Sequence, residues 1–352
     1  MATTGEPPFR ALITHGFVND SQGRKMSKSL GNVVDPNEIT KQSGAEIIRL
    51  WAASSDYGND IGCGKEELTR VTESYRKMRN TMRFLLGALS DFNYAKDAVD
   101  FSKHNLNLNG LNEIPLIDRW MLHQVNELIR NVTASFEIYE FHRVYQLLNQ
   151  FFTVTLSATY MDILKDRLYT WKHNGIERRA AQTVYYHMTS SLLRMMAPLV
   201  TFLSEEAYGY FAGKTQESIL LETFPVENSS WSAPSVQALF EKLMAVRTDV
   251  QKKLEELRAS KVIGSSLEAK VTVEADGETL AALNQLNNSH KKSTLREFFI
   301  VSDIEIKNGP FKVTAQKADG EKCVRCWVFS TEISKEPATL GICPKCVEAL
   351  SE

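Results

Sequence analysis

The chain has 352 residues, of which 43% are hydrophobic and 24% charged, and its formal net charge is −2. This composition is typical of a globular protein with room for roughly two to four domains. The near-neutral charge excludes a global field that attracts a polyanion, so a nucleic-acid site must be a local basic patch. No apolar run reaches the roughly 20 residues that span a bilayer, and the first residues lack a signal-peptide pattern, so we expect a cytoplasmic chain without a membrane partner.

The first informative segment is a loop with two lysines, residues 25–29, which reads Lys-Met-Ser-Lys-Ser between Gly23 and Gly31. Glycines give such a loop hinge freedom, and ammonium groups stabilise the charge that develops when phosphate bonds rearrange. The lysine loop therefore predicts a polyphosphate site at Lys25 and Lys28. A solvated basic loop is the alternative, because a short Lys/Ser motif is not specific by itself.

Helical periodicity dominates the middle of the chain. Over residues 65–89, apolar side chains repeat at intervals of three and four from Leu68 to Leu89, which indicates a long helix with one packing face. Further helical segments follow and predict an all-α bundle, with a break at Pro198. In chain order we expect a strand at 11–18, a turn at 19–23, a helix start at 35–36, helices at 45–53, 65–89, 116–132, 141–152, 156–166, 177–196, 199–211 and 236–260, and strands at 268–275 and 298–306.

Two groups of charged residues accompany the predicted helices. Arg76, Arg79 and Arg83 share one stripe of the 65–89 helix. A solvated helix face and a phosphate-contacting stripe on nucleic acid fit that stripe equally well. The second group comprises Asp162, Lys165, Asp166 and Arg167, for which a surface ion-pair network is favoured over a role in binding.

Four of the five cysteines form two CxxC pairs near the end of the sequence. Cys323 and Cys326 are separated by sixteen residues from Cys343 and Cys346. Two such knuckles at this spacing predict one four-thiolate zinc site, whose closed shell makes the ion structural rather than catalytic. Redox-active pairs or unligated thiols are the alternative. The fifth cysteine, Cys63, is expected to be a small buried thiol.

The residues in and beside the knuckles suggest a second role for this segment. Arg325 and Lys345 lie inside the two CxxC pairs, and Trp327 follows the first. Positive charge next to an aromatic face is a plausible RNA-contact set. For Trp327, packing over the zinc hairpin is an equal alternative.

Several of these segments resemble one known family. The lysine loop with its flanks is similar to the signature loop of class I aminoacyl-tRNA synthetases, and residues 75–84 resemble the stem helix of isoleucyl-tRNA synthetases. Residues 160–169 and 198–206 resemble the anticodon-binding bundle, and the cysteine segments resemble the terminal zinc finger of isoleucyl-tRNA synthetases. The resemblance implies a mainly α fold in four parts: the end of a Rossmann-like catalytic domain at 1–62, a stem helix and anticodon-binding bundle at 63–230, an α+β junction domain at 231–318 and a zinc finger at 319–352.

The resemblance also implies an activity and its site residues. Enzymes of this family join L-isoleucine to its tRNA through an adenylate, with ATP and Mg²⁺. Lys28 matches the lysine that contacts the nucleotide phosphates, with Ser29 beside it and Lys25 in a supporting role. The His-x-Gly-His half of the ATP site does not occur here, since His15 and Gly16 do not match it. We therefore expect the C-terminal part of a longer enzyme, monomeric and inactive by itself, which binds tRNA through Arg76, Arg79, Arg83, Arg325, Trp327 and Lys345.

Two other functions fit parts of the sequence. One is a non-catalytic RNA-binding or interaction protein built from a helical bundle and a zinc ribbon. The other is a DNA-binding zinc-finger protein, since a related finger occurs in a DNA glycosylase family. The net charge of −2 argues against the second function.

Overall fold

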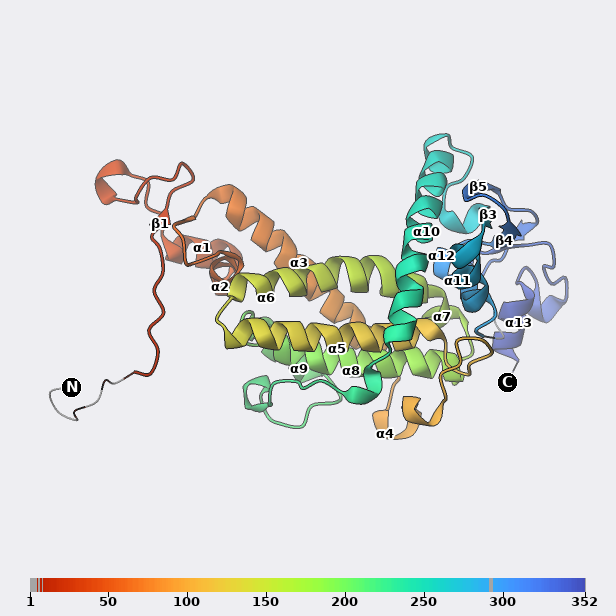
Figure 1. Ribbon diagram of the computed structural model, residues 1–352, viewed down its shortest axis with the longest axis horizontal. Coiled ribbons are helices and arrows are strands. Elements are labelled where there is room, and N and C mark those ends of the chain that lie inside the picture. The colour runs from red at the N-terminus through yellow and green to blue at the C-terminus, as the bar shows by residue number, and fades with distance from the viewer. Residues whose placement is uncertain (1–4, 6, 8, 291–293, 352) are drawn as a thin grey trace.

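The computed structural model describes residues 5, 7, 9–290 and 294–351. The molecule is elongated, with β1 (Val18–Asn19) near one end of its long axis and α13 (Pro344–Leu350) near the other (Figure 1). A bundle of helices fills the middle and separates the lysine loop from the cysteine cluster. Among the described residues, no helix combines the length and the apolar character that crossing a membrane requires.

The N-terminal segment has little regular structure. β1 pairs in parallel with β2 (Ile61–Gly62) in a two-residue ladder, and Asn19 also forms an isolated antiparallel bridge with Lys25. The predicted strand at 11–18 is therefore wrong for residues 11–17, because they have no ladder partner among the described residues. As expected, Asp35 caps α1 (Pro36–Ser43), and α2 (Ala45–Ser54) follows.

The central bundle is built from long helices, as the periodicity predicts. Its helices are α3 (Lys65–Ala88), α5 (Leu116–Glu137), α6 (Phe141–Gln150), α7 (Asp162–Thr170), α8 (Ile176–Met196) and α9 (Thr201–Tyr210), with the short α4 (Tyr94–Asp97) in the connector. The π-helical segment η3 (Phe151–Met161) joins α6 to α7 without a break. Two separate helices at 141–152 and 156–166 were expected, but no glycine or proline lies between 141 and 170 to interrupt the helix.

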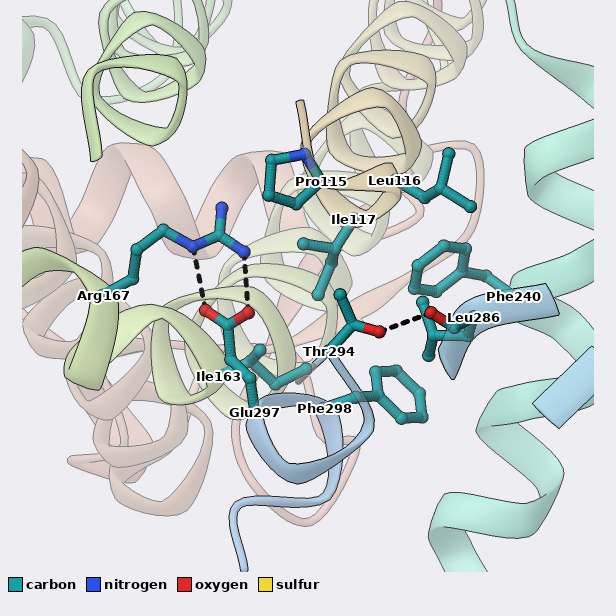
Figure 2. Close-up of a pocket in the computed structure, with 10 residues that line it drawn as sticks. All are labelled: Pro115, Leu116, Ile117, Ile163, Arg167, Phe240, Leu286, Thr294, Glu297 and Phe298. Atoms are coloured by element: carbon teal, nitrogen blue, oxygen red, sulfur yellow. Dashed lines mark hydrogen bonds and ion pairs between the residues drawn. The ribbon is translucent and has the colours of Figure 1, made fainter. Parts of the chain in front are cut away.

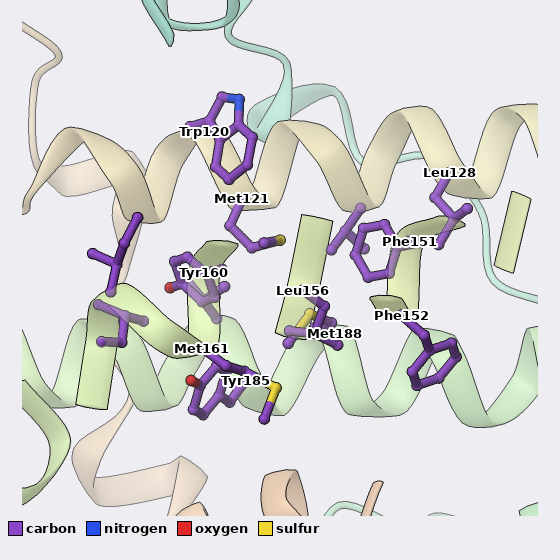
Figure 3. Packing of buried hydrophobic residues seen from close by; sticks show 14 of the residues in the cluster. Trp120, Met121, Leu128, Phe151, Phe152, Leu156, Tyr160, Met161, Tyr185 and Met188 are labelled. Carbon is purple, nitrogen blue, oxygen red and sulfur yellow. The ribbon is translucent and has the colours of Figure 1, made fainter. Parts of the chain in front are cut away.

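The bundle core is one continuous apolar cluster. Figure 3 shows Trp120 and Met121 of α5 above Leu156 and Tyr160 of η3, with α8 below them. Tyr160 meets Tyr185 edge to face, with ring centroids 5.7 Å apart. The predicted packing face of α3 is confirmed in part, since Val71, Met78, Met82, Leu85 and Leu89 are buried while Leu68 and Tyr75 are half-buried.

A smaller α+β unit follows the bundle. α10 (Pro234–Ala259) crosses beside it in Figure 1, and the three-stranded sheet has the order β4-β3-β5. β3 (Ala269–Ala275) is parallel to β4 (Asp303–Asn308) and antiparallel to β5 (Lys312–Lys317), which the sequence interpretation missed. The strand expected at 298–306 begins only at Asp303. Phe298 and Phe299 instead end helix α12 (Thr294–Phe299), which with α11 (Gly277–Asn287) covers the sheet.

Two oppositely charged side chains of α2 attach the N-terminal segment to the bundle. Glu46 accepts hydrogen bonds from the backbone N–H groups of Phe202 (2.7 Å) and Leu203 (3.1 Å) in the first turn of α9. Arg49 donates to the carbonyl oxygens of Pro198 (2.7 Å) and Leu199 (3.2 Å), which follow α8. The expected break at Pro198 thus leaves backbone groups unpaired, and α2 satisfies them: Glu46 at the N-terminus of α9, where a negative charge is favourable, and Arg49 in the connection between α8 and α9.

Candidate functional site

The lysine loop is shaped by hydrogen bonds from two polar side chains. The Asp20 carboxylate accepts hydrogen bonds from the backbone N–H groups of Gln22 and Arg24, from Arg24 Nε and from Asn32 Nδ2, each at 2.9 Å. These donors hold the pKa of Asp20 well below its usual range, chiefly the amide of Asn32. Asn32 also accepts from Ser27 N–H at 2.9 Å and donates to the Lys25 carbonyl oxygen at 3.2 Å. Asp20 and Asn32 therefore form a clasp that closes the loop.

The structure brings the three predicted loop residues together on the surface. Lys25, Lys28 and Ser29 are all exposed. Lys28 and Ser29 begin a 3-10 turn, Lys28–Leu30, which ends at Gly31 with φ +64°, a conformation that favours glycine. The Lys25 ammonium group lies 5.6 Å from the centroid of the Phe17 ring. Two exposed ammonium groups on a pre-formed loop suit a polyphosphate ligand.

The predicted arginine stripe lies on the exposed side of α3. Arg76, Arg79 and Arg83 are all exposed, and Arg79 forms an ion pair with Glu206 of α9 at 3.0 Å. Such surface pairs contribute little to stability and exchange easily with solvent or a phosphate group. The stripe is thus accessible to a polyanion, with one of its members paired.

The four knuckle cysteines lie together. Cys323, Cys326, Cys343 and Cys346 are buried, and their sulfur atoms all lie within 4.8 Å of one another. The Sγ atoms of Cys323 and Cys346 are 3.8 Å apart, and those of Cys326 and Cys343 are 3.6 Å apart. Four sulfurs at about 2.3 Å from one tetrahedral zinc ion are about 3.8 Å apart, so this donor set fits zinc. The hairpin of β6 (Glu321–Lys322) and β7 (Phe329–Ser330) presents the first knuckle, and α13 carries Cys346 of the second.

The three residues predicted to contact RNA from the knuckles do not share one surface. Trp327 is 61% exposed, so its ring is not buried over the hairpin, and the Lys322 ammonium group lies 5.3 Å from the ring centroid. The other two side chains reach the bundle. Arg325 donates from Nη1 to the Thr170 carbonyl oxygen, and Lys345 Nζ lies 2.5 Å from Asp166 Oδ2.

A buried charged network beside this contact was not foreseen. Arg167 is fully buried, which corrects its assignment to a surface network. Its guanidinium donates to Asp118 at 2.7 Å. It also donates two hydrogen bonds, of 2.8 and 2.9 Å, to the Glu297 carboxylate, and Figure 2 draws both of them. Burial raises the pKa values of Asp118 and Glu297, which Arg167 opposes. Helical periodicity could have predicted the burial of Arg167, since it falls on the same face of α7 as the apolar Ile163 and Leu164.

The cavity next to this network is too small for a ligand. Figure 2 shows it between the start of α5, α7 and α12, lined by Ile117, Arg167 and Phe298 among others. Its volume is about 10 Å³, which is room for a single water molecule at most. Among the described residues, the role that the contacts support for the network is to hold α12 against the bundle.

Comparison with known families agrees with this arrangement. Residues 1–63 match the class I tRNA synthetases (I, L, M and V), residues 118–273 the anticodon-binding domain of tRNA ligase, and residues 320–349 the zinc finger found in FPG and IleRS. The isoleucine–tRNA ligases of Thermotoga maritima and Carboxydothermus hydrogenoformans are each 42% identical, over 99% and 100% of this chain respectively. That of Geobacter sulfurreducens is 40% identical over 99% of it. A LeuRS–tRNA–LeuAMS complex from Agrobacterium radiobacter K84 matches 62% of this chain and 24% of its own, with 21% identity and a TM-score of 0.46.

These matches define the class of the protein. The chain is part of the class I tRNA synthetases, with an anticodon-binding bundle and a zinc finger in the order that the fold shows. Within that class it belongs to the isoleucine–tRNA ligase family, whose members match it from end to end. It spans 38% of the length of these relatives.

Proposed function

We propose that this chain is the tRNA-binding, C-terminal portion of an isoleucine–tRNA ligase. The observation that carries the proposal is the joint presence of an exposed, clasped lysine loop and a buried four-cysteine cluster at opposite ends of one helical bundle. We divide it into the end of the catalytic domain (1–62), the stem helix and bundle (63–230), the junction domain (231–318) and the zinc module (319–352). The whole enzyme acts in the cytoplasm as a monomer.

In the proposed reaction, the lysine loop serves the activation of L-isoleucine by ATP with Mg²⁺. Lys28 stabilises the negative charge that develops as the α-phosphate is attacked, and Lys25 adds a second ammonium group on the same loop. Ser29 lies beside Lys28 in the 3-10 turn, so its hydroxyl group can donate to the same phosphates. The clasp keeps these groups in one arrangement before the nucleotide binds. The chain by itself lacks the His-x-Gly-His motif and is expected to be inactive.

In the same proposal, tRNA lies along the exposed side of α3 and reaches the zinc module. Arg76, Arg79 and Arg83 contact phosphate groups, and the exposed ring of Trp327 stacks on a base. Arg325 and Lys345 are left out of this set because their charged ends contact α7. We assign zinc to the four cysteines as a structural ion.

The direct test is binding of the chain to an isoleucine-accepting tRNA at several salt concentrations. We expect tighter binding than to a methionine-accepting tRNA, and a salt slope that falls by about 1 for each phosphate contact removed in Arg76→Ala and Arg83→Ala. Arg70→Ala, an exposed arginine on another face of α3, is the matched control and should leave the slope unchanged. Equal weak binding to both tRNAs, or equal slopes in all variants, contradicts the proposal.

Two further assays separate the proposal from its rivals. The full-length protein should exchange pyrophosphate into ATP when isoleucine is present, and a full-length protein without that exchange is a non-catalytic RNA-binding protein. Duplex DNA should compete poorly with tRNA for the chain. Competition by duplex DNA at the same concentration as tRNA would favour the DNA-binding alternative.

A further inference from the structure

The zinc module contacts the bundle through two cations that lie between its cysteines. Arg325 stands between Cys323 and Cys326, and Lys345 stands between Cys343 and Cys346. Each knuckle therefore contributes one positive side chain to the contact with the bundle. A change in the fold of either knuckle must move the cation that it carries.

Both cations bind at the C-terminal end of α7. The Asp166 carboxylate receives Lys345 Nζ at 2.5 Å, Trp171 Nε1 at 2.9 Å and the Thr170 hydroxyl group at 2.5 Å. Arg325 donates to the carbonyl oxygen of Thr170, the last residue of the helix. Carbonyl groups at a helix C-terminus have no partner inside the helix and carry partial negative charge, so a cation is favourable there.

The same two cations lie next to ligand cysteines in the sequence. Four thiolates around one divalent zinc ion carry a net charge of −2. Arg325 directly precedes Cys326, and Lys345 directly precedes Cys346, so the position of each cation's backbone is set by a ligand cysteine. Each cation is therefore tied to the metal centre by the chain and to α7 by its charged end.

The module has little else to hold its shape. Its buried cluster consists of the four cysteines and Ile342, with Val328, Ile333 and Val347 packed against it. A unit with so small a core depends on the ion for its folding. Loss of the ion therefore removes the geometry that places both cations on α7.

We propose that Arg325 and Lys345 are positioning residues that tie the zinc centre to the C-terminal end of α7, so that the ion and the bundle stabilise each other. The proposal rests on the zinc site proposed above. Asp166 is the anchor on the bundle side, and its neighbour Arg167 holds α12 through Glu297. One end of α7 thus fixes both the zinc module and the junction domain.

The test measures how fast the full chain releases zinc to an excess of chelator, followed with a metal-sensitive dye. We expect Lys345→Met and Arg325→Met to release zinc about 10-fold faster or more, since residues that support metal ligands from outside typically change metal affinity by about 10–100-fold. Lys335→Met removes an exposed charge from the same module and should match the unmodified chain. Release at the Lys335→Met rate in both variants overturns the proposal.

A variant outside the module guards against misfolding of the knuckles themselves. Asp166→Asn keeps all module residues and should also speed zinc release, whereas Asp249→Asn, in an exposed pair with Lys252, should not. Combining Asp166→Asn with Lys345→Met should add little to either change, because both break the same contact. Fully additive effects would show that Lys345 acts through something other than Asp166.

Hydrogen exchange gives a readout that does not depend on the rate of metal release. Removing zinc should reduce amide protection in α7 near residues 166–171 and leave α5 unchanged. Unchanged protection in α7 after zinc removal overturns the coupling while leaving the zinc site intact. A chain that holds no zinc at all would overturn the zinc site and the coupling together.

Discussion

The two ends of this molecule hold their candidate functional residues in opposite ways. In the lysine loop the 3-10 turn and α1 contain no buried residue, and the shape comes from hydrogen bonds to Asp20 and Asn32. In the zinc module the candidate ligands are themselves the core, since all four cysteines are buried. Functional side chains are therefore separable from the fold at the first end and inseparable from it at the second.

Both ends nevertheless attach to the bundle by the same device. Glu46 satisfies the first turn of α9, Arg49 binds carbonyl oxygens between α8 and α9, and Arg325 binds the carbonyl oxygen of the last residue of α7. Each charge is opposite in sign to the partial charge of the backbone groups that it meets. The bundle thus holds the N-terminal segment through α2 and the zinc module through α7.

The largest effect is expected from removing a zinc ligand. Cys343→Ser should abolish zinc binding and unfold the module, because ligation supplies on the order of 10 kcal/mol in small zinc modules. Zinc content per chain and hydrogen exchange over residues 320–350 measure the change. Cys63→Ser, at a buried thiol far from the cluster, should keep one zinc ion per chain. A Cys343→Ser chain with a full zinc content would show that the cluster is not the site.

A smaller loss is expected beside the module, where charge is buried in the bundle. Arg167→Met leaves the carboxylates of Asp118 and Glu297 without their partner and should lower the free energy of unfolding by about 3–5 kcal/mol. The exposed pair of Lys165 and Asp162 is the control, and Lys165→Met should cost about 1 kcal/mol or less. Urea denaturation followed by circular dichroism compares the two variants, and equal midpoints would contradict a structural role for the network.

At the opposite end, breaking the clasp should open the loop without unfolding the protein. Asn32→Ala removes three hydrogen bonds, each worth roughly 0.5–1.5 kcal/mol, so trypsin should cleave after Arg24 and Lys25 about fivefold faster or more. Asn37→Ala, on the nearby exposed turn of α1, should leave the rate unchanged. The same cleavage rate in both variants would mean that Asn32 does not hold the loop.

The smallest structural effect is expected at the proposed catalytic lysine. Lys28→Met replaces an exposed side chain and should change the free energy of unfolding by no more than about 0.5 kcal/mol. In the full-length enzyme the same change should strongly reduce isoleucine-dependent pyrophosphate exchange, because the phosphate charge loses a partner. If Lys28→Met shifts the unfolding midpoint as far as Arg167→Met does, the lysine-loop side chains are not separable from the fold, and the contrast with the zinc module is lost.

Much of the helical framework follows from local pattern. The helix at 65–89 and the break at Pro198 need only periodicity and the geometry of proline, and the structure confirms both. The segments that were misjudged depend on partners elsewhere. Residues 11–17 have strand-like composition but no ladder partner among the described residues. Phe298 has a strand-like sequence context, but in the structure it is a buried residue of helix α12.

The sequence by itself determined where the two candidate sites lie, because the spacing of their residues is local. Two CxxC pairs bring four sulfurs together through tight turns, and the lysine loop carries its own caps and glycines. Only the tertiary structure decided where the long charged side chains point. Arg167, Arg325 and Lys345 look alike in sequence to solvated cations, yet each meets an acceptor across the fold. A long, flexible cationic side chain binds the negative group that tertiary packing places within its reach, and the residues next to it in the sequence do not specify that group.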